Sequence, residues 1–313
     1  MNSAKSLSIV TTLYKSESVV EKFVRQASAA ASKIGLPYEI VLVNDGSPDA
    51  SLQRALDLQD KERNVVVVDL ARNFGHHHAI LAGLSEASGD LTFLIDSDLQ
   101  EDPAWLKGFA DRMRVSGADV VYGQQQRRKG GLLEIVAGAL FYKIFNALSD
   151  VKVPVNFVTA RLMKKQYVDA LLEYGERALF LGGTFVLAGF VQVPFPISKK
   201  SSGSSTYTLG KRLKLFVDAL TSFSPRPLHF VLIVGSLITL LSLAGVGYIC
   251  LRVILGGTLA GWASLIVSIW FFGGLTLFSI GLVGAYVGKI LLEAKRRPLF
   301  KVRRIHRLSQ LQH

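Results

Sequence analysis

Short apolar runs recur along the first half of the chain, and each is followed by a segment that mixes apolar and polar positions. Runs of this length, bounded by turn residues, predict buried strands. The predicted strands are Leu7–Leu13, Tyr38–Val43, Val65–Leu70, Leu91–Ile95 and Asp119–Tyr122. The segments between them predict helices, which alternate with the strands as in βαβ units. The pattern therefore predicts an α/β fold with a doubly wound, mostly parallel sheet.

The next part of the chain has a weaker pattern. Residues 132–148 are apolar with few charges and could form a helix near a membrane surface. Phe157–Met163 predicts a strand and Lys164–Tyr174 a helix, and Gly182-Gly183-Thr184 predicts a turn in a loop. Val191–Ile197 contains two prolines, so it is expected to be an edge strand at best.

Two long apolar blocks dominate the C-terminal third. Lys, Arg, Asp and Glu are absent from Pro227–Leu251 and again from Val253–Gly288. Each block exceeds the roughly 20 residues that cross a bilayer, so two transmembrane helices are expected. The segment after Lys289 is basic, which favours a cytoplasmic location for the C-terminal end. Two spans then place the N-terminal part in the cytoplasm as well.

The patterns divide the chain into four parts. We expect a cytoplasmic α/β domain over 1–200, a polar loop and interfacial amphipathic helix over 201–226, a transmembrane hairpin over 227–289, and a basic tail over 290–313. Glycines in the hairpin permit close contacts between helices, which leaves a homo-oligomer open.

The charge and cysteine content of the chain limit its possible binding partners and its cross-links. The 313 residues carry a formal net charge of +12, and seven Lys and Arg residues follow Glu293 with no acidic residue among them. Much of the positive charge is thus local to one end, beside the apolar blocks, and we expect a membrane partner and no nucleic acid. Cys250 is the only cysteine, which excludes an intrachain disulfide.

Acidic residues stand where predicted strands end. Asp96 and Asp98 follow one strand, Asp45 follows another, and Glu17 comes shortly after the first. Open α/β sheets bind ligands at the carboxyl ends of their strands. If the backbone stays extended, Asp96 and Asp98 point the same way and suit a hard cation such as Mg²⁺ or Mn²⁺. A solvated acidic turn is the alternative.

The glycine-rich dinucleotide fingerprint and the P-loop are both missing from the sequence. A nucleotide bound to this sheet would therefore be held by carboxylates and a metal. We interpret the acidic strand ends as a site with a nucleobase near Asp45 and a diphosphate near Asp98.

Three segments carry a family resemblance. VNDGSPDAS (43–51), LARNFGHHHAILAGL (70–84) and ASGDLTFLIDSDLQEDP (87–103) resemble the motifs of family 2 glycosyltransferases. The similarity is greatest to the polyprenyl-phosphate branch, which includes dolichol-phosphate mannose synthases and bactoprenol-phosphate glucosyltransferases. It extends over nearly the whole chain, including the paired apolar blocks.

The resemblance implies a GT-A fold, a UDP- or GDP-linked sugar as donor, a divalent cation (Mg²⁺ or Mn²⁺) and a polyprenyl phosphate acceptor. By position in the motifs, it implies that the metal and diphosphate site is formed by Asp96, Asp98 and Gln100. The residues implied to contact the nucleotide are Leu13, Tyr14, Glu17, Asp45, Asn73 and Gly75. Ser205 and Tyr207 match a loop that contacts the acceptor phosphate.

One departure from the family pattern bears on mechanism. Thr159 stands where many relatives have an acidic residue that could act as a general base. A phosphate monoester has a second pKa of about 6 and is largely dianionic at neutral pH, so it can attack without a base. Arg161 is the first candidate to bind that phosphate and to act in catalysis, followed by Lys199 and Lys200.

Three consecutive histidines, His76, His77 and His78, begin a predicted helix. Their side chains point in different directions, which disfavours one shared metal, and a contact from one of them to the donor is expected instead.

The sequence as a whole predicts an inverting, inner-membrane glycosyltransferase that moves a sugar to undecaprenyl phosphate at the cytoplasmic face. The alternatives are a membrane transferase that uses a hydroxyl acceptor in polysaccharide synthesis, and a non-catalytic membrane partner protein.

Overall fold

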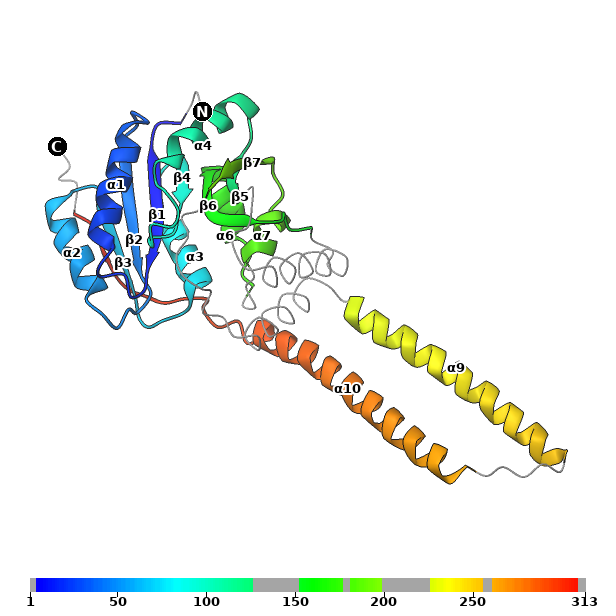
Figure 1. Cartoon of the computed structure of the whole chain (residues 1–313). Coiled ribbons are helices and arrows are strands. Elements are labelled where there is room, and N and C mark those ends of the chain that lie inside the picture. The colour runs from blue at the N-terminus through cyan, green and yellow to red at the C-terminus, as the bar shows by residue number, and fades with distance from the viewer. Residues whose placement is uncertain (1–3, 126–151, 177–180, 199–225, 256–260, 309–313) are drawn as a thin grey trace. The chain divides into compact units, whose positions relative to one another are not determined.

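The computed structural model describes residues 4–125, 152–176, 181–198, 226–255 and 261–308 (Figure 1). The chain forms two compact units. Unit 1 comprises Met1–Lys143, Val151–Tyr207 and Arg297–His313, and unit 2 comprises Ile144–Asp150 and Thr208–Arg296.

Unit 1 is built on an eight-stranded sheet with the order β7-β5-β6-β4-β1-β2-β3-β8. Its strands are β1 (Leu7–Leu13), β2 (Tyr38–Asn44), β3 (Val65–Leu70), β4 (Leu91–Leu94), β5 (Val120–Gln125), β6 (Phe157–Lys164), β7 (Gln192–Ile197) and β8 (Val302–His306). The four central strands β4, β1, β2 and β3 run parallel. They are almost wholly buried, because helices cover both faces, as is usual for parallel strands.

The helices of unit 1 form two layers. The apolar stripes of α1 (Val20–Ser32), α2 (Ser51–Lys61) and α4 (Trp105–Ser116) pack on one face of the sheet. On the other face lie α3 (His76–Glu86), α6 (Lys165–Leu172) and α7 (Leu181–Leu187). Amphipathic helices on both sides of one sheet are the expected way to bury it.

The predicted strands and helices of the N-terminal half are confirmed, with ends that differ by a few residues. The expectation of a mostly parallel sheet was only partly right, because the sheet is mixed. β6 pairs antiparallel with both β4 and β5, and β8 pairs antiparallel with β3. β7 lies at the edge of the sheet, as its two prolines predict.

The predicted turn at Gly182-Gly183-Thr184 was wrong, since these residues lie within α7. All three are buried, and the Tyr167 hydroxyl donates a hydrogen bond of 2.8 Å to the Phe185 carbonyl. Packing against α6 thus outweighs the local preference of two glycines for a turn. The predicted apolar helix over 132–148 and the predicted interfacial helix within 201–226 lie outside the described residues.

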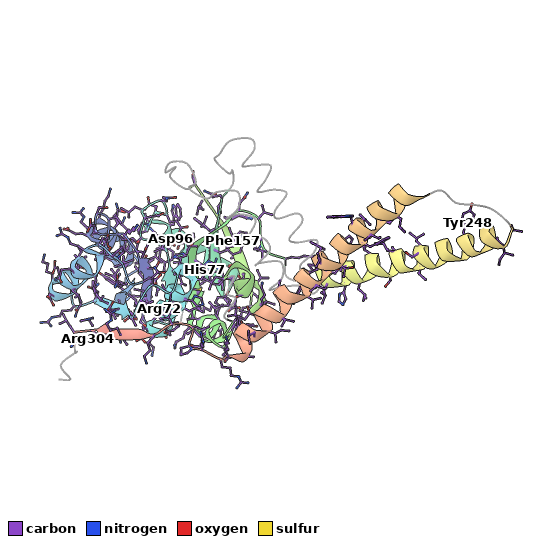
Figure 2. All side chains as sticks on the ribbon, turned by 90° about the horizontal axis from the view of Figure 1, so that it is seen from below. Arg72, His77, Asp96, Phe157, Tyr248 and Arg304 are labelled. Carbon is purple, nitrogen blue, oxygen red and sulfur yellow. The ribbon has the colours of Figure 1, made fainter. Side chains whose placement is uncertain are left out.

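The basic segment predicted as a tail holds β8. Val67–Leu70 of β3 pairs with Val302–His306, and Arg304 lies at this edge of the sheet (Figure 2). The Arg303 guanidinium lies 3.4 Å from the Asp69 carboxylate and donates to the Ala71 carbonyl at 2.8 Å. Residues more than 200 positions apart in sequence therefore complete one sheet.

Unit 2 contains two long helices, α9 (Arg226–Ile254) and α10 (Trp262–Ala294). Among the described residues, one segment, Ser268–Ala294 in α10, is long and apolar enough to cross a membrane. Arg226–Ser242 of α9 is a shorter apolar stretch. Large apolar side chains along both helices are exposed, including Leu240, Leu241, Trp270 and Leu277.

Candidate active site

The carboxyl ends of the four parallel strands lie along one edge of the sheet. Leu13 at the end of β1 is in register with Asn44 of β2, and Asn44 is in register with Asp69 of β3. Val10 of β1 is in register with Leu94, the last residue of β4. The loops that follow these strands therefore meet, and they contain the acidic residues that the sequence placed there.

The loop from Asp96 to Gln100 is a turn, so the expectation that Asp96 and Asp98 lie on extended backbone was wrong. β4 ends at Leu94, and Leu99 adopts a positive φ of 60°. The Asp98 carboxylate is exposed and accepts a 3.0 Å hydrogen bond from the Gln100 amide. This bond closes the loop on itself and leaves the carboxylate facing solvent.

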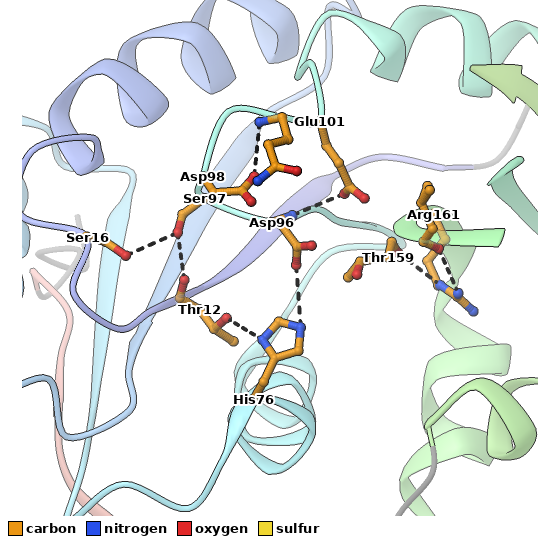
Figure 3. A network of polar contacts seen from close by, with 11 residues as sticks. Thr12, Ser16, His76, Asp96, Ser97, Asp98, Glu101, Thr159 and Arg161 are labelled. Atoms are coloured by element: carbon orange, nitrogen blue, oxygen red, sulfur yellow. Dashed lines mark hydrogen bonds and ion pairs between the residues drawn. The ribbon is translucent and has the colours of Figure 1, made fainter. Parts of the chain in front are cut away.

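Ser97, between the two aspartates, ties this loop to β1. Its hydroxyl donates to the Thr12 carbonyl at 2.9 Å and lies 3.4 Å from the Ser16 hydroxyl (Figure 3). Ser97 is 6% exposed. The side chain that points inward therefore fixes the register between the two acidic residues and the loop after β1.

His76, the first residue of α3, contacts both the end of β1 and the aspartate loop (Figure 3). Its Nδ1 lies 3.1 Å from Thr12 Oγ1, and its Nε2 lies 3.5 Å from Asp96 Oδ1. The imidazole is about half exposed, with 47% of the side chain accessible. His76 thus reaches the first aspartate of the loop.

Asp45 is buried and holds the loop after β3. Its two carboxylate oxygens accept hydrogen bonds from the amides of Phe74, at 2.7 Å, and Gly75, at 3.0 Å. The Asn73 side chain donates to the Asp45 carbonyl at 3.0 Å. Burial raises the pKa of Asp45, against the opposing effect of the two amides and of His76 and His78. This carboxylate organises the loop through backbone contacts, and its predicted contact with the nucleotide stays a prediction.

Gly75 permits the turn into α3. Its φ of 93° lies in the region that favours glycine, and its amide reaches Asp45 at the same time. Asn73 is exposed, and the Arg72 guanidinium lies 4.0 Å from the centre of the Phe74 ring. Asn73 and Gly75 therefore border the site next to Asp45.

Glu17 and Asp49 join the loop after β1 to the loop after β2. Glu17 Oε2 accepts a 2.9 Å hydrogen bond from the Ala50 amide at the start of α2, and Asp49 accepts one of 3.2 Å from the Glu17 amide. Glu17 thus satisfies an amide at a helix N-terminus. Leu13 is buried, whereas Tyr14 is 49% exposed. The predicted contacts of Leu13, Tyr14 and Glu17 with the nucleotide stay predictions.

Arg161 lies on β6 in register with Leu94 and is 2% exposed. Its Nε and Nη2 donate to the carbonyls of Thr159 and Val158, and its Cζ lies 3.2 Å from the centre of the Phe185 ring. A side chain enclosed in this way has little access to a ligand. Its predicted contact with the acceptor phosphate stays a prediction, and its burial favours a supporting role.

The other predicted acceptor residues, Lys199, Lys200, Ser205 and Tyr207, lie outside the described residues. Glu101, Ser97 and Thr12 were missed in the sequence. Ser97 stands between two aspartates, and Glu101 follows directly after the aspartate loop, but nothing local in the sequence distinguishes a buried serine or glutamate from an exposed one.

The aspartate loop fits only one kind of metal site. Within the described ranges, no group of three or more His, Cys, Asp and Glu side chains is arranged to hold a metal ion. Mg²⁺ bound together with a nucleotide commonly uses one or two carboxylates plus the phosphates of the substrate. Asp96 and Asp98, with Gln100 beside them, suit that shared coordination and do not suit a metal held by protein alone.

Residues 8–172 match the model of the family described as glycosyl transferase family 2. The chain belongs to this family. A Mycobacterium tuberculosis protein named provisionally as a glycosyltransferase is 47% identical over 96% of this chain and 88% of its own length. An uncharacterized glycosyltransferase of Synechocystis is 35% identical over 95% of this chain and 94% of its own.

This family 2 glycosyltransferase also resembles a prophage-derived bactoprenol glucosyl transferase of Shigella flexneri. The two are 32% identical over 96% of this chain and 98% of the relative. These relatives support the polyprenyl-phosphate branch of the family. A solved structure of glucosyl-3-phosphoglycerate synthase from Mycobacterium tuberculosis covers 69% of this chain and 77% of its own at 19% identity, with a TM-score of 0.46.

Proposed function

We propose that this family 2 glycosyltransferase moves a sugar from a nucleoside diphosphate to a polyprenyl phosphate, with inversion at the anomeric carbon. The observation that supports it most is the link between the aspartate loop and the strand-end loops through Ser97, Thr12 and His76. The link brings Asp96 and Asp98 beside the loops that the family motifs assign to the nucleotide.

The proposed reaction also requires a divalent cation, Mg²⁺ or Mn²⁺, bound at the aspartate loop. Asp96, Asp98 and Gln100 would hold it, and when bound it supplies positive charge that offsets the charge of a departing nucleoside diphosphate. The chain's own residues orient these groups. His76 steadies the Asp96 carboxylate, and the exposed Asp98 carboxylate is accessible to a bound metal and diphosphate.

The acceptor is proposed from Thr159 and from the relatives named for bactoprenol. A hydroxyl acceptor needs a base to take its proton, and Thr159 cannot act as one. A phosphate dianion needs none: one of its oxygens attacks the anomeric carbon while the bond from that carbon to the diphosphate oxygen breaks. Catalysis then consists of positioning and electrostatic stabilisation of the leaving group.

The membrane is part of the same proposal. Unit 1 contains chain from both before and after α9 and α10, since β8 pairs with β3. A segment that leaves a folded domain and returns to its sheet crosses a bilayer an even number of times or not at all. We therefore propose two spans, α9 and α10, with both termini in the cytoplasm of a cell whose inner membrane holds the lipid acceptor.

The proposal is tested by a donor screen. The purified full chain is incubated with undecaprenyl phosphate, Mg²⁺ or Mn²⁺, and a panel of UDP- and GDP-sugars, and the lipid-linked sugar is measured by mass spectrometry. Asp98→Ala is expected to lower transfer by at least about 100-fold, because it removes a diphosphate and metal contact.

Asp111→Ala, which removes an exposed carboxylate on α4, is the matched control and should transfer like the wild type. Full activity in Asp98→Ala would overturn the proposed site. Transfer to a sugar hydroxyl but not to the lipid phosphate would favour the polysaccharide alternative.

A further inference from the structure

Glu101 is a buried carboxylate directly after the aspartate loop. Glu101 is 0% exposed, and its Oε2 accepts a 3.3 Å hydrogen bond from the Asp96 amide (Figure 3). The bond spans the loop, from its first residue to the residue after its last. Glu101 therefore closes the base of the loop that carries both aspartates.

Arg161 is a buried cation on the neighbouring strand. It is in register with Leu94, two residues before Asp96, and with Tyr122 of β5. The guanidinium donates to two carbonyls of its own strand and lies against the Phe185 ring. Figure 3 shows Glu101, Asp96 and Arg161 in the same close-up, from two different segments of the chain.

Glu101 and Arg161 are an acidic and a basic side chain that are both buried in unit 1. Burial lowers the pKa of Arg161 to about 10, and the charges of Tyr167 and Glu101 act in the opposite direction. A buried charge whose partner is removed is left uncompensated, which is more costly than removing both members. The side chain of Glu101 thus offsets the charge of Arg161 while it holds the backbone of Asp96.

We propose that Glu101 and Arg161 are positioning residues that hold the Asp96–Gln100 loop in the geometry that binds the metal and the diphosphate. The inference rests on the proposed function for the identity of the ligand. Ser97 ties the loop to β1, and Glu101 closes the base of the loop through the Asp96 amide. In this proposal the opposite charge of Arg161 keeps the Glu101 carboxylate in place. Asp98 projects from between these two attachments.

The test is Mn²⁺-dependent binding of UDP and GDP, measured by calorimetry on the purified full chain without an acceptor. The variants are Glu101→Gln, Arg161→Met and the double variant. Each single change is expected to weaken nucleotide binding by about 10–100-fold, which is typical when a residue that supports metal ligands is lost. Hydrogen exchange of the segment around Asp96 should become faster in Glu101→Gln.

The double variant is expected to bind more tightly than either single variant. It buries no unpaired charge, and the amide oxygen introduced by Glu101→Gln can still accept a hydrogen bond from the Asp96 amide. Asp169→Asn is the matched control, since it removes a carboxylate from an exposed pair with Lys165. It should leave binding and hydrogen exchange unchanged.

Three results would overturn the inference. These are wild-type affinity in both single variants, losses that simply add in the double variant, and a lower melting temperature with unchanged affinity of the folded protein. If the single variants do not fold, the double variant decides, and it is expected to fold and bind. Because no acceptor is present, nucleotide binding that responds to Glu101 supports the inference even if transfer to polyprenyl phosphate fails.

Discussion

At the scale of single residues, carboxylates in this site bind the chain's own amides and hydroxyls. Asp49 accepts hydrogen bonds from the hydroxyls of Ser47 and Ser51 and from the Glu17 amide. Burial raises its pKa, but these bonds together outweigh burial and lower the pKa of Asp49 to about 2. The ionised form therefore stabilises the junction between the loops after β1 and β2.

Asp49→Asn gives a test of this junction that depends on pH. A depressed carboxylate pKa contributes stability that is present above the unfolded pKa of about 3.9 and is lost as pH falls towards about 2. After a discount for solvent exposure, we expect the variant to be about 1 kcal/mol less stable at pH 6, or roughly 2–4 °C in melting temperature. The difference should shrink when melting is measured at pH 3, and a difference that is constant with pH would contradict the assignment.

At the scale of elements, the site depends on how closely α3 approaches the sheet. A Cβ added at Gly83 would lie 2.5 Å from Val10 Cγ1 and 2.7 Å from Val43 Cγ2. Valine side chains in strands have little freedom to move aside. The same helix carries His76 at its first position, so its distance from the sheet also sets the position of the imidazole at Asp96.

Gly83→Ala is expected to destabilise the protein by about 1–3 kcal/mol, because the added methyl overpacks the contact between α3 and the sheet. It should also weaken nucleotide binding through the displacement of His76. Gly175→Ala is the control, since nothing lies within 4 Å of a Cβ there. Thermal melts of both variants measure the effect, and equal stability of the two would show that α3 can shift without cost.

At the scale of the whole chain, β8 returns the C-terminal segment to the sheet that the N-terminal segment begins. The Ala71 amide donates to the Lys301 carbonyl at 2.9 Å, and the Arg307 guanidinium lies 3.7 Å from the Glu39 carboxylate. Ala71 comes shortly before Asn73 in the loop beside Asp45. The segment after α10 is thus a structural part of unit 1 and contacts the base of a loop in the candidate site.

This connectivity predicts that both ends of the chain lie on one side of the membrane. In a Cys250→Ser background, single cysteines at Ala4→Cys and Leu308→Cys are expected to react with an impermeant maleimide only after cells are permeabilised. A cysteine at Thr258→Cys, between α9 and α10, should react in intact cells. Opposite behaviour of the two ends would contradict the two-span topology.

The sequence by itself determined the central strands, most of the helices and the meeting of the acidic loops at one edge of the sheet. These features follow from local information, since an apolar run that stops at turn residues fixes both a strand and the place where its polar end lies. Family motifs added the expected roles of Asp96, Asp98 and Asp45.

Only the tertiary structure decided where the later strands pair and which charges are buried. β8 is rich in arginine, so its sequence predicts a solvated tail. β6 inserts antiparallel between β5 and β4. Neither pairing could be predicted, because pairing partners far apart in sequence leave no local signal. Arg161 and Glu101 would both be expected at the surface. Arg161 is enclosed because β6 lies between β5 and β4 and because the Phe185 ring of α7 packs against its guanidinium, and no single stretch of sequence contains that arrangement.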